Sequence, residues 1–178
     1  MILALQLIYW FLPAYLANSA PPWAAKLFPA WKRPIDFGLQ WRGKRLLGEN
    51  KTWRGIVIGT LVGGLAFLVQ KFLLINMIHF PFIPYSSLPW WTGFLLGFGA
   101  IFIGDTGKSL VKRRFEIKPG EPFVPWDQAD YTLGAFLLTF WLYWPGWLAF
   151  FFLLVFNSLL SAGSHWLGWR LGLLKDRF

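Results

Sequence analysis

Three aspartates in the second half of the chain have residue types and a spacing that suit metal chemistry. Asp105 lies at the end of an apolar run. Asp127 and Asp130 are three residues apart, so a helix that begins there would carry both carboxylates on one side. Carboxylate oxygens suit Mg²⁺, which is a hard cation. We therefore expect Asp105, Asp127 and Asp130 to hold one or two Mg²⁺ ions at a catalytic centre.

Cationic side chains follow Asp105 closely. If residues 99–113 form a helix, one face of it carries Asp105, Lys108, Ser109 and Lys112. Ammonium and hydroxyl groups beside a metal ion could neutralise and orient phosphate groups in a transfer reaction. The sequence therefore predicts a catalytic role for Lys112. It also predicts phosphate binding by Lys108, Ser109, Arg113 and Lys118.

A second polar group directly precedes the apolar run that begins at Gly55. It consists of Asn50, Lys51, Thr52 and Arg54. At a helix N-terminus, free N–H groups and the helix dipole favour a bound anion, and two cations add to this effect. The alternative is a capped helix whose cations only mark one side of a membrane, and composition alone does not separate the two. We expect this group to bind an anionic part of a substrate.

The composition indicates which class of protein holds these residues. Of the 178 residues, 56% are hydrophobic and only 14% are charged, whereas about a quarter of the residues of a soluble domain are charged. Five apolar runs approach the roughly 20 residues that a helix needs to cross a bilayer: they are residues 2–18, 55–75, 90–110, 129–144 and 146–167. The sequence predicts an all-α, multi-pass integral membrane protein with about five spans in a single domain, residues 1–178.

The distribution of Lys and Arg predicts the orientation of these spans. Eight lie between Lys26 and Arg54, five between Lys108 and Lys118, and three from Arg170 onward, whereas the loops on the opposite side hold only Lys71. Because Lys and Arg are enriched in cytoplasmic loops, we expect an outside N-terminus and a cytoplasmic C-terminus. The cytoplasmic loops would be residues 19–54 and 111–128, with the charged site on that side. The net charge of +9 then reflects topology and membrane lipids, and does not indicate nucleic acid.

The depth of Asp105 follows from the length of the third apolar run. Residues 90–103 are too few to cross, so the helix must continue through Asp105 to about Leu110. By the same argument the fourth helix should begin near Asp127. A carboxylate at this depth costs several kcal/mol unless it is paired or binds a metal, so a functional role is expected. The alternative is a buried ion pair of Asp105 with Lys108 or Lys112.

These residues resemble the signature of the CDP-diacylglycerol synthases. The similar segments are Ser109-Leu110-Val111-Lys112-Arg113, Lys118 and Asp127-Gln128-Ala129-Asp130, and Asp105 also matches an acid of that family. Three features depart from the signature. Pro119 stands where the family has aspartate, Gln128 stands where it has arginine, and its Pro-x-His-Gly-Gly segment is absent.

At these departures the chain is similar to the archaeal branch of the family, the CDP-archaeol synthases. Two segments carry this likeness, Asn50-Lys51-Thr52-Trp53-Arg54-Gly55 and Lys118-Pro119-Gly120-Glu121. The resemblance implies Mg²⁺-dependent transfer of CMP from CTP onto the phosphate of 2,3-bis-O-(geranylgeranyl)-sn-glycerol 1-phosphate. The products would be CDP-archaeol and pyrophosphate, and the setting would be archaeal phospholipid biosynthesis at the cell membrane.

Two other functions agree with parts of the sequence. One is a CDP-diacylglycerol synthase-like enzyme that uses another lipid phosphate. The other is an ion or phospholipid transporter, in which Asp105 and the cations would line a pathway. Against a transporter, both charged groups lie on the expected cytoplasmic side, and the outer halves of the spans carry no ionisable residues that could form a second gate.

Overall fold

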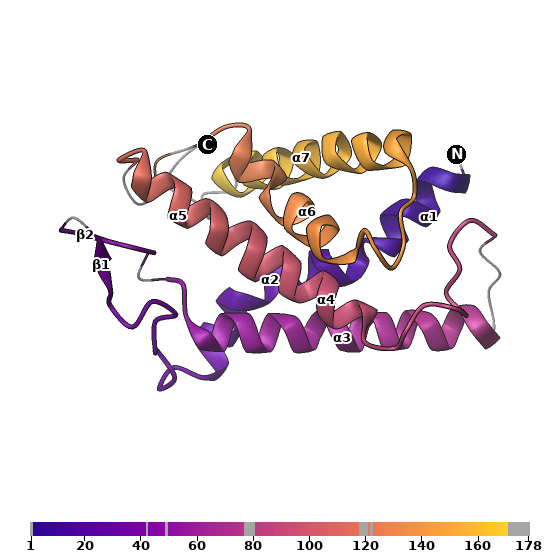
Figure 1. The fold of residues 1–178 in the computed structure, drawn as a ribbon, viewed down its shortest axis with the longest axis horizontal. Coiled ribbons are helices and arrows are strands. Elements are labelled where there is room, and N and C mark those ends of the chain that lie inside the picture. Colours follow the sequence, from indigo (N-terminus) through magenta and orange to yellow (C-terminus); the bar gives the residue numbers. More distant parts are fainter. Residues whose placement is uncertain are drawn as a thin grey trace.

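The structure, a computed structural model, describes residues 2–41, 43–48, 50–76, 81–117, 121 and 123–170. Most of these residues are helical, as the composition predicts (Figure 1). The elements in chain order are α1 (Ile2–Trp10), α2 (Leu12–Leu27), β1 (Gln40–Trp41), β2 (Lys44–Arg45), α3 (Trp53–Asn76), α4 (Thr92–Phe98), η1 (Gly99–Thr106), α5 (Gly107–Arg114), α6 (Trp126–Thr139) and α7 (Trp147–Arg170).

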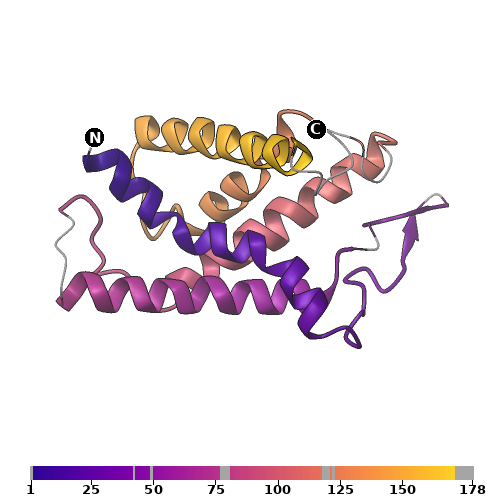
Figure 2. The same cartoon turned by 180° about the vertical axis from the view of Figure 1, so that it is seen from behind.

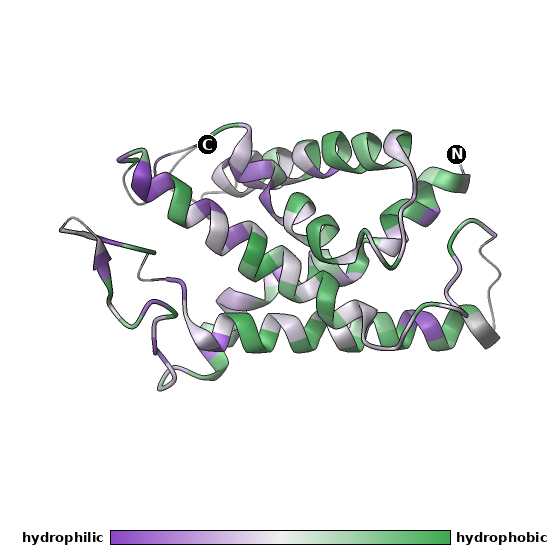
Figure 3. Cartoon of the chain, viewed as in Figure 1, coloured by the Kyte–Doolittle hydropathy of each residue, from purple (hydrophilic) through white to green (hydrophobic). Residues whose placement is uncertain are grey.

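Long helices on two sides enclose the rest of the molecule. In Figure 1, α3 and α7 lie on opposite sides, α4, η1 and α5 cross between them as one continuous diagonal, and α6 lies beside that diagonal. The view from behind shows α1 and α2 running along the other face, between α7 and α3 (Figure 2). Hydrophilic residues gather at the end that carries the β1–β2 hairpin and α5 (Figure 3). The candidate site must therefore be sought at that end.

Three helices are long and apolar enough to cross a membrane, by length and composition. They are Trp53–Leu74, Thr92–Arg114 and Trp147–Leu167. They coincide with the second, third and fifth predicted spans, and the third helix continues past Asp105, as its length argument required. The start of α6 at Trp126 also confirms the expected start of the fourth helix.

The predicted boundaries of the first and fourth spans are wrong. Residues 2–18 are divided between α1 and α2, which are separate at Phe11, and α2 continues to Leu27 although Pro21 and Pro22 lie inside it. The prolines are accommodated where α2 packs closely on α3, since a Cβ on Gly55 of α3 would lie 3.4 Å from the Cβ of Pro21. Helix α6 ends at Thr139, before residue 144, and its 14 residues span only about 21 Å.

Small residues allow the central helices to approach closely. A Cβ on Gly63 of α3 would lie 3.0 Å from the Cα of Gly97 in α4, and a Cβ on Gly93 would lie 2.7 Å from the carbonyl oxygen of Gly63. Gly55, Gly59 and Gly63, which follow one another at four-residue spacing on α3, therefore serve helix packing. Fully buried Trp10, Phe11, Phe67 and Leu96 fill the adjoining core.

One charged side chain holds the loop that precedes α3. Between α2 and α3, the carboxylate of Asp36 accepts hydrogen bonds from the N–H groups of Gly38 and Leu47, both at 3.0 Å, and pairs with Arg45 at 3.2 Å. Burial alone would raise the pKa of Asp36, but these hydrogen bonds and the guanidinium charge outweigh it, so the pKa lies below its ordinary value. This loop leads directly into Lys51 and the start of α3.

Candidate active site

Close contacts at glycines bring the continuous helix α4–η1–α5 against α6. A Cβ on Gly134 would lie 2.2 Å from the carbonyl oxygen of Gly99 and 2.4 Å from the amide nitrogen of Gly104. A Cβ on Gly104 would lie 2.4 Å from the carbonyl oxygen of Asp130. Real Cβ atoms do not adopt such distances, so only glycine permits this contact. Through it, Asp105 comes to lie beside the first turn of α6.

The segment that carries Asp105 is π-helical. Within η1 the Thr106 hydroxyl donates a hydrogen bond of 3.1 Å to the carbonyl oxygen of Ile101, five residues earlier. Short π-helical segments inside α-helices occur frequently at functional sites. Here the segment joins the apolar helix α4 to the cationic helix α5, and Asp105 lies in its last turn. No feature of the sequence predicted this geometry.

The three predicted aspartates converge, and the ammonium group of Lys108 lies among them. The Nζ atom of Lys108 is 2.6 Å from Asp130 Oδ2, 3.2 Å from Asp127 Oδ1 and 3.7 Å from Asp105 Oδ1. The side chains of Lys108 and Asp130 are only 16% and 8% exposed, so these charges are largely removed from water. The sequence spacing predicted one charged face around Asp105 and Lys108 and another on α6, and these two faces therefore meet.

Two further lysines extend this group. Lys51, just before α3, places its Nζ atom 2.6 Å from Asp105 Oδ2, and Lys112 places its Nζ atom 3.2 Å from Asp127 Oδ2. Lys112 also donates to the backbone carbonyl of Glu121. We call the resulting set of six side chains the charged cluster: Lys51, Asp105, Lys108, Lys112, Asp127 and Asp130. Its formal charges balance, with three carboxylates and three ammonium groups.

The charged cluster includes all three predicted metal ligands. Among the described residues, no three His, Cys, Asp or Glu side chains are grouped as a metal centre requires. The ammonium of Lys108 instead lies among the three carboxylates. Ion pairs to Lys108 therefore stand where metal–carboxylate contacts were expected. The donor chemistry still fits a hard cation, because the three groups offer only carboxylate oxygens and already converge on one positive charge.

The predicted substrate-binding residues fall into three groups. Lys51 and Lys108 belong to the charged cluster, and buried Ser109 lies one residue beyond Lys108 on α5. Arg54 and Arg113 are directed to backbone carbonyl oxygens, those of Phe28 at 3.0 Å and Ile117 at 2.6 Å. Of the remaining three residues, Asn50 is exposed, and Thr52 is buried and forms an isolated backbone bridge with Pro34. Lys118 lies outside the described residues.

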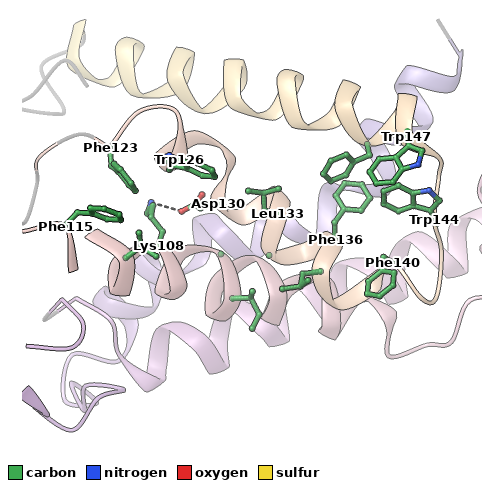
Figure 4. A pocket seen from close by; sticks show the side chains of 16 residues that line it. Lys108, Phe115, Phe123, Trp126, Asp130, Leu133, Phe136, Phe140, Trp144 and Trp147 are labelled. Carbon is green, nitrogen blue, oxygen red and sulfur yellow. Dashed lines mark ion pairs between the residues drawn. The ribbon is translucent and has the colours of Figure 1, made fainter. Parts of the chain in front are cut away.

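An apolar cavity of about 1060 Å³ begins at the charged cluster. Figure 4 shows Lys108 and Asp130 near one end of it, Leu133 farther along, and Trp144 and Trp147 at the other end. Its volume slightly exceeds the roughly 300–1,000 Å³ that is typical of small-molecule sites. Lys108 and Asp130 are its only charged lining residues among those described. The cavity therefore suits an elongated apolar molecule with one polar end.

Sequence reasoning did not identify the residues that line this cavity. A signal for them exists, because Asp130, Leu133, Gly134 and Leu137 repeat at helical spacing and all line the cavity. The stripe extends from the carboxylates along α6. It could not be distinguished from ordinary core packing, because the other wall comes from the third helix, which is distant in sequence.

Comparisons with known proteins show which family the chain resembles. The family model described as CarS-like, CDP-archaeol synthase, matches residues 1–177. Curated relatives named CDP-archaeol synthase include one from Pyrococcus furiosus, 34% identical, with 94% of this chain and 93% of the relative covered. A second, from Thermococcus kodakarensis, is 36% identical, with 92% and 91% covered. A third, from Methanopyrus kandleri, is 38% identical, with 89% and 82% covered.

A solved structure adds the same likeness in three dimensions. It is described as an intramembrane enzyme for archaeal membrane lipid biosynthesis, and it aligns with a TM-score of 0.72 at 28% identity. The alignment covers 90% of this chain and 92% of that one, so the likeness extends over the fold and not only over the site segments. The chain therefore belongs to the CDP-archaeol synthase family.

Proposed function

We propose that this protein transfers CMP from CTP onto the phosphate of 2,3-bis-O-(geranylgeranyl)-sn-glycerol 1-phosphate and forms CDP-archaeol and pyrophosphate. One observation carries the proposal beyond family membership. The charged cluster stands at the end of a long apolar cavity, with Lys108 and Asp130 common to both. An isoprenoid ether lipid phosphate likewise has one anionic end and long apolar chains. Membership of an enzyme family removes the reason to keep a transporter as the alternative.

The chemistry requires positioning more than acid–base catalysis. A lipid phosphate is largely a dianion near neutral pH, since its second pKa is about 6. One of its oxygens can attack the α-phosphorus of CTP directly, so that a new P–O bond forms as the bond to the β-phosphate breaks and pyrophosphate leaves. Lys51, Lys108 and Lys112 would hold and neutralise the phosphate oxygens during this exchange.

A divalent cation would offset the negative charge that CTP and the lipid phosphate add to the charged cluster, and we propose Mg²⁺. Asp105, Asp127 and Asp130 would hold it, because their oxygens suit this ion and converge from two helices. When bound, it would supply Lewis-acid stabilisation of the negative charge on the reacting phosphates. With the carboxylates so engaged, the three ammonium groups of the charged cluster would be available to the phosphates of CTP and of the lipid.

We further propose that the chain is a single catalytic domain of about five spans, with its N-terminus outside and the charged cluster facing the cytoplasm, where CTP is found. The Lys and Arg distribution supports this orientation. A tag inserted in residues 71–89 should be reachable from outside intact cells, whereas tags in residues 31–48 should not. Labelling of the 71–89 loop only after cell lysis would reverse the orientation.

The direct test is an assay of the purified protein in detergent with CTP, Mg²⁺ and the lipid phosphate. We expect pyrophosphate release that depends on all three and disappears with chelator, and a CDP-lipid product detected by mass spectrometry. Asp130→Asn serves as the control for contaminating enzymes. Equal turnover of a diacylglycerol phosphate would favour the CDP-diacylglycerol synthase-like alternative, and no turnover with any lipid phosphate would refute the proposal.

A further inference from the structure

The end of the apolar cavity that is remote from the charged cluster is lined by a cluster of aromatic side chains. We call it the aromatic floor: Phe136, Trp144, Trp147 and Phe150, all of which line the cavity. Resting on the function proposed above, we propose that the aromatic floor sets the length of the isoprenoid chain that the enzyme accepts. The floor would be a specificity determinant for the lipid, remote from the atoms that react.

The cavity has a fixed distance between its polar end and this floor. Asp130 and Lys108 mark the position of the lipid phosphate, and the chain would then follow α6 past Leu133 (Figure 4). Helix α6 rises 1.5 Å per residue, so the six steps from Asp130 to Phe136, the first ring of the floor, cover about 9 Å, and Trp144 and Trp147 lie beyond Phe136 along the cavity (Figure 4). A chain anchored by its phosphate therefore meets the floor after a defined length.

The aromatic floor is packed as one unit. The ring of Trp144 lies 5.0 Å from that of Trp147, 5.5 Å from that of Phe150 and 6.0 Å from that of Phe136, measured between centroids. Phe136 is only 4% exposed and its ring lies 5.0 Å from that of Phe150, which ties the floor to the core. Aromatic side chains have few rotatable bonds, so such a cluster yields little to an incoming chain.

The chain segment under the floor is equally constrained. Between α6 and α7, Pro145 fixes one backbone angle and Gly146 adopts φ +90°, a conformation that favours glycine. This places Trp144 and Trp147 on either side of a sharp reversal of the chain. A longer chain must then leave the cavity sideways or displace the floor, and in either case its last isoprene unit loses apolar contact.

The experiment compares three lipid phosphates in the assay described above. They carry geranylgeranyl chains, farnesyl chains that are one isoprene unit shorter, and geranylfarnesyl chains that are one unit longer. We expect the wild type to use the longer substrate with a kcat/KM at least ~10-fold below that for the geranylgeranyl substrate, since hydrophobic pockets discriminate by about that factor per small group. Trp144→Ala should raise the relative kcat/KM of the longer substrate by a similar factor.

A matched control is available in the same connection. Trp141 is 60% exposed, its ring lies 5.8 Å from that of Trp91, and it does not line the cavity. Trp141→Ala should keep the wild-type ratio between substrates. Because each ratio is measured within one variant, a smaller folded fraction cancels. If Trp144→Ala does not fold, Trp147→Ala replaces it, because Trp147 is 68% exposed and contributes less to the core.

The outcomes separate this proposal from the proposed function. A wild type that uses all three lipids equally, or a floor variant that is active with an unchanged ratio, refutes the role of the aromatic floor and leaves the cytidylyl transfer intact. Absence of CTP-dependent pyrophosphate release with every lipid refutes the function itself. A shift of the ratio in Trp144→Ala or Trp147→Ala, with Trp141→Ala unchanged, supports the proposal.

Discussion

Two lysines at opposite ends of the molecule each face three oxygen-bearing groups, but the groups differ. Lys71, near the end of α3, donates hydrogen bonds to the backbone carbonyl oxygens of Tyr85 at 2.8 Å and Ser86 at 3.2 Å, and also to that of Leu88. Lys108 faces three carboxylates. One lysine holds a loop in place through neutral partners, whereas the other lies within concentrated negative charge.

The difference indicates what each site was selected for. An ammonium has three N–H donors, so three carbonyl oxygens satisfy Lys71 completely and leave nothing for a ligand. One ammonium cannot neutralise three carboxylates, and Lys51 and Lys112 are drawn in to balance them. Such an arrangement is costly for stability alone, and local costs of this kind are expected at functional sites.

The largest expected effect would come from removing one carboxylate next to Lys108. Asp105→Asn keeps the shape and one acceptor oxygen but removes the charge, and we expect turnover to fall by ~1000-fold, or about 4 kcal/mol. Steady-state kinetics at saturating CTP, with Mg²⁺ varied, measures the loss. Near-normal turnover in limiting Mg²⁺ would make Asp105 a structural partner, like the carbonyl groups around Lys71.

A double variant tests whether the carboxylates act together. If Asp105 and Asp127 serve one centre, Asp105→Ala combined with Asp127→Ala should be scarcely worse than either change alone. Additive losses would mean that Asp105 on η1 and Asp127 on α6 contribute separately to turnover. The single-centre interpretation of the charged cluster would then have to be abandoned.

The next largest effect should come from the glycine contact that assembles the cluster. Gly134→Ala forces α6 away from η1, and we expect a loss of about 3 kcal/mol in stability together with most of the activity. Gly163→Ala is the matched control, because nothing lies within 4 Å of its added Cβ. Thermal unfolding in detergent and the pyrophosphate assay read out the two effects. Full activity of Gly134→Ala would show that the carboxylates need no such close approach.

A smaller effect, on stability alone, is expected at the other lysine. Lys71→Met keeps the aliphatic stem but removes hydrogen bonds from a charged donor, which should lower the free energy of unfolding by about 2 kcal/mol. The folded variant should retain wild-type kcat, whereas Lys108→Met should lose most activity. The comparison between the two lysines fails if both variants lose kcat to the same extent.

The smallest effect should come from Asp36, a carboxylate with a full set of partners. Its pKa is lowered in the folded protein, so its stabilising contribution is present above the ordinary pKa of about 3.9 and is lost as pH falls through the lower folded value. Asp36→Asn should cost about 1 kcal/mol at pH 7, and this difference should shrink below pH ~4. Unfolding curves of both proteins between neutral and acidic pH measure it, and a difference that grows on acidification would contradict this account.

Much of the fold follows from the sequence because apolar length and helix starts are local signals. The starts of α3 at Trp53 and of α6 at Trp126 were expected from the residues beside them. The continuation of α2 through Pro21 and Pro22 was not, because it depends on packing against α3. The end of α6 at Thr139 was missed as well, since apolar residues continue into the turn that follows.

The sequence predicted all six residues of the charged cluster as site residues, but not which of them form ion pairs, and it also included Arg113, which is directed to a backbone carbonyl. Spacing placed Asp105 and Lys108 on one face, and it placed Asp127 and Asp130 on another. It could not indicate that Lys108 lies among the carboxylates, that Lys51 reaches Asp105, or that Arg54 is directed to a backbone carbonyl. Those contacts depend on how closely two helices approach, which here is decided by single glycines.

The π-helical segment η1 has a consequence for how the sequence can change over time. A π-turn contains one residue more than an α-turn, so everything after it is rotated by about 100° relative to an uninterrupted α-helix. Loss of one residue between Gly99 and Thr106 would restore the α-helical phase and turn the cationic face of α5 away from α6, without changing any charge. The segment is thus an angular spacer, and its residue count is expected to tolerate far less variation than its side chains.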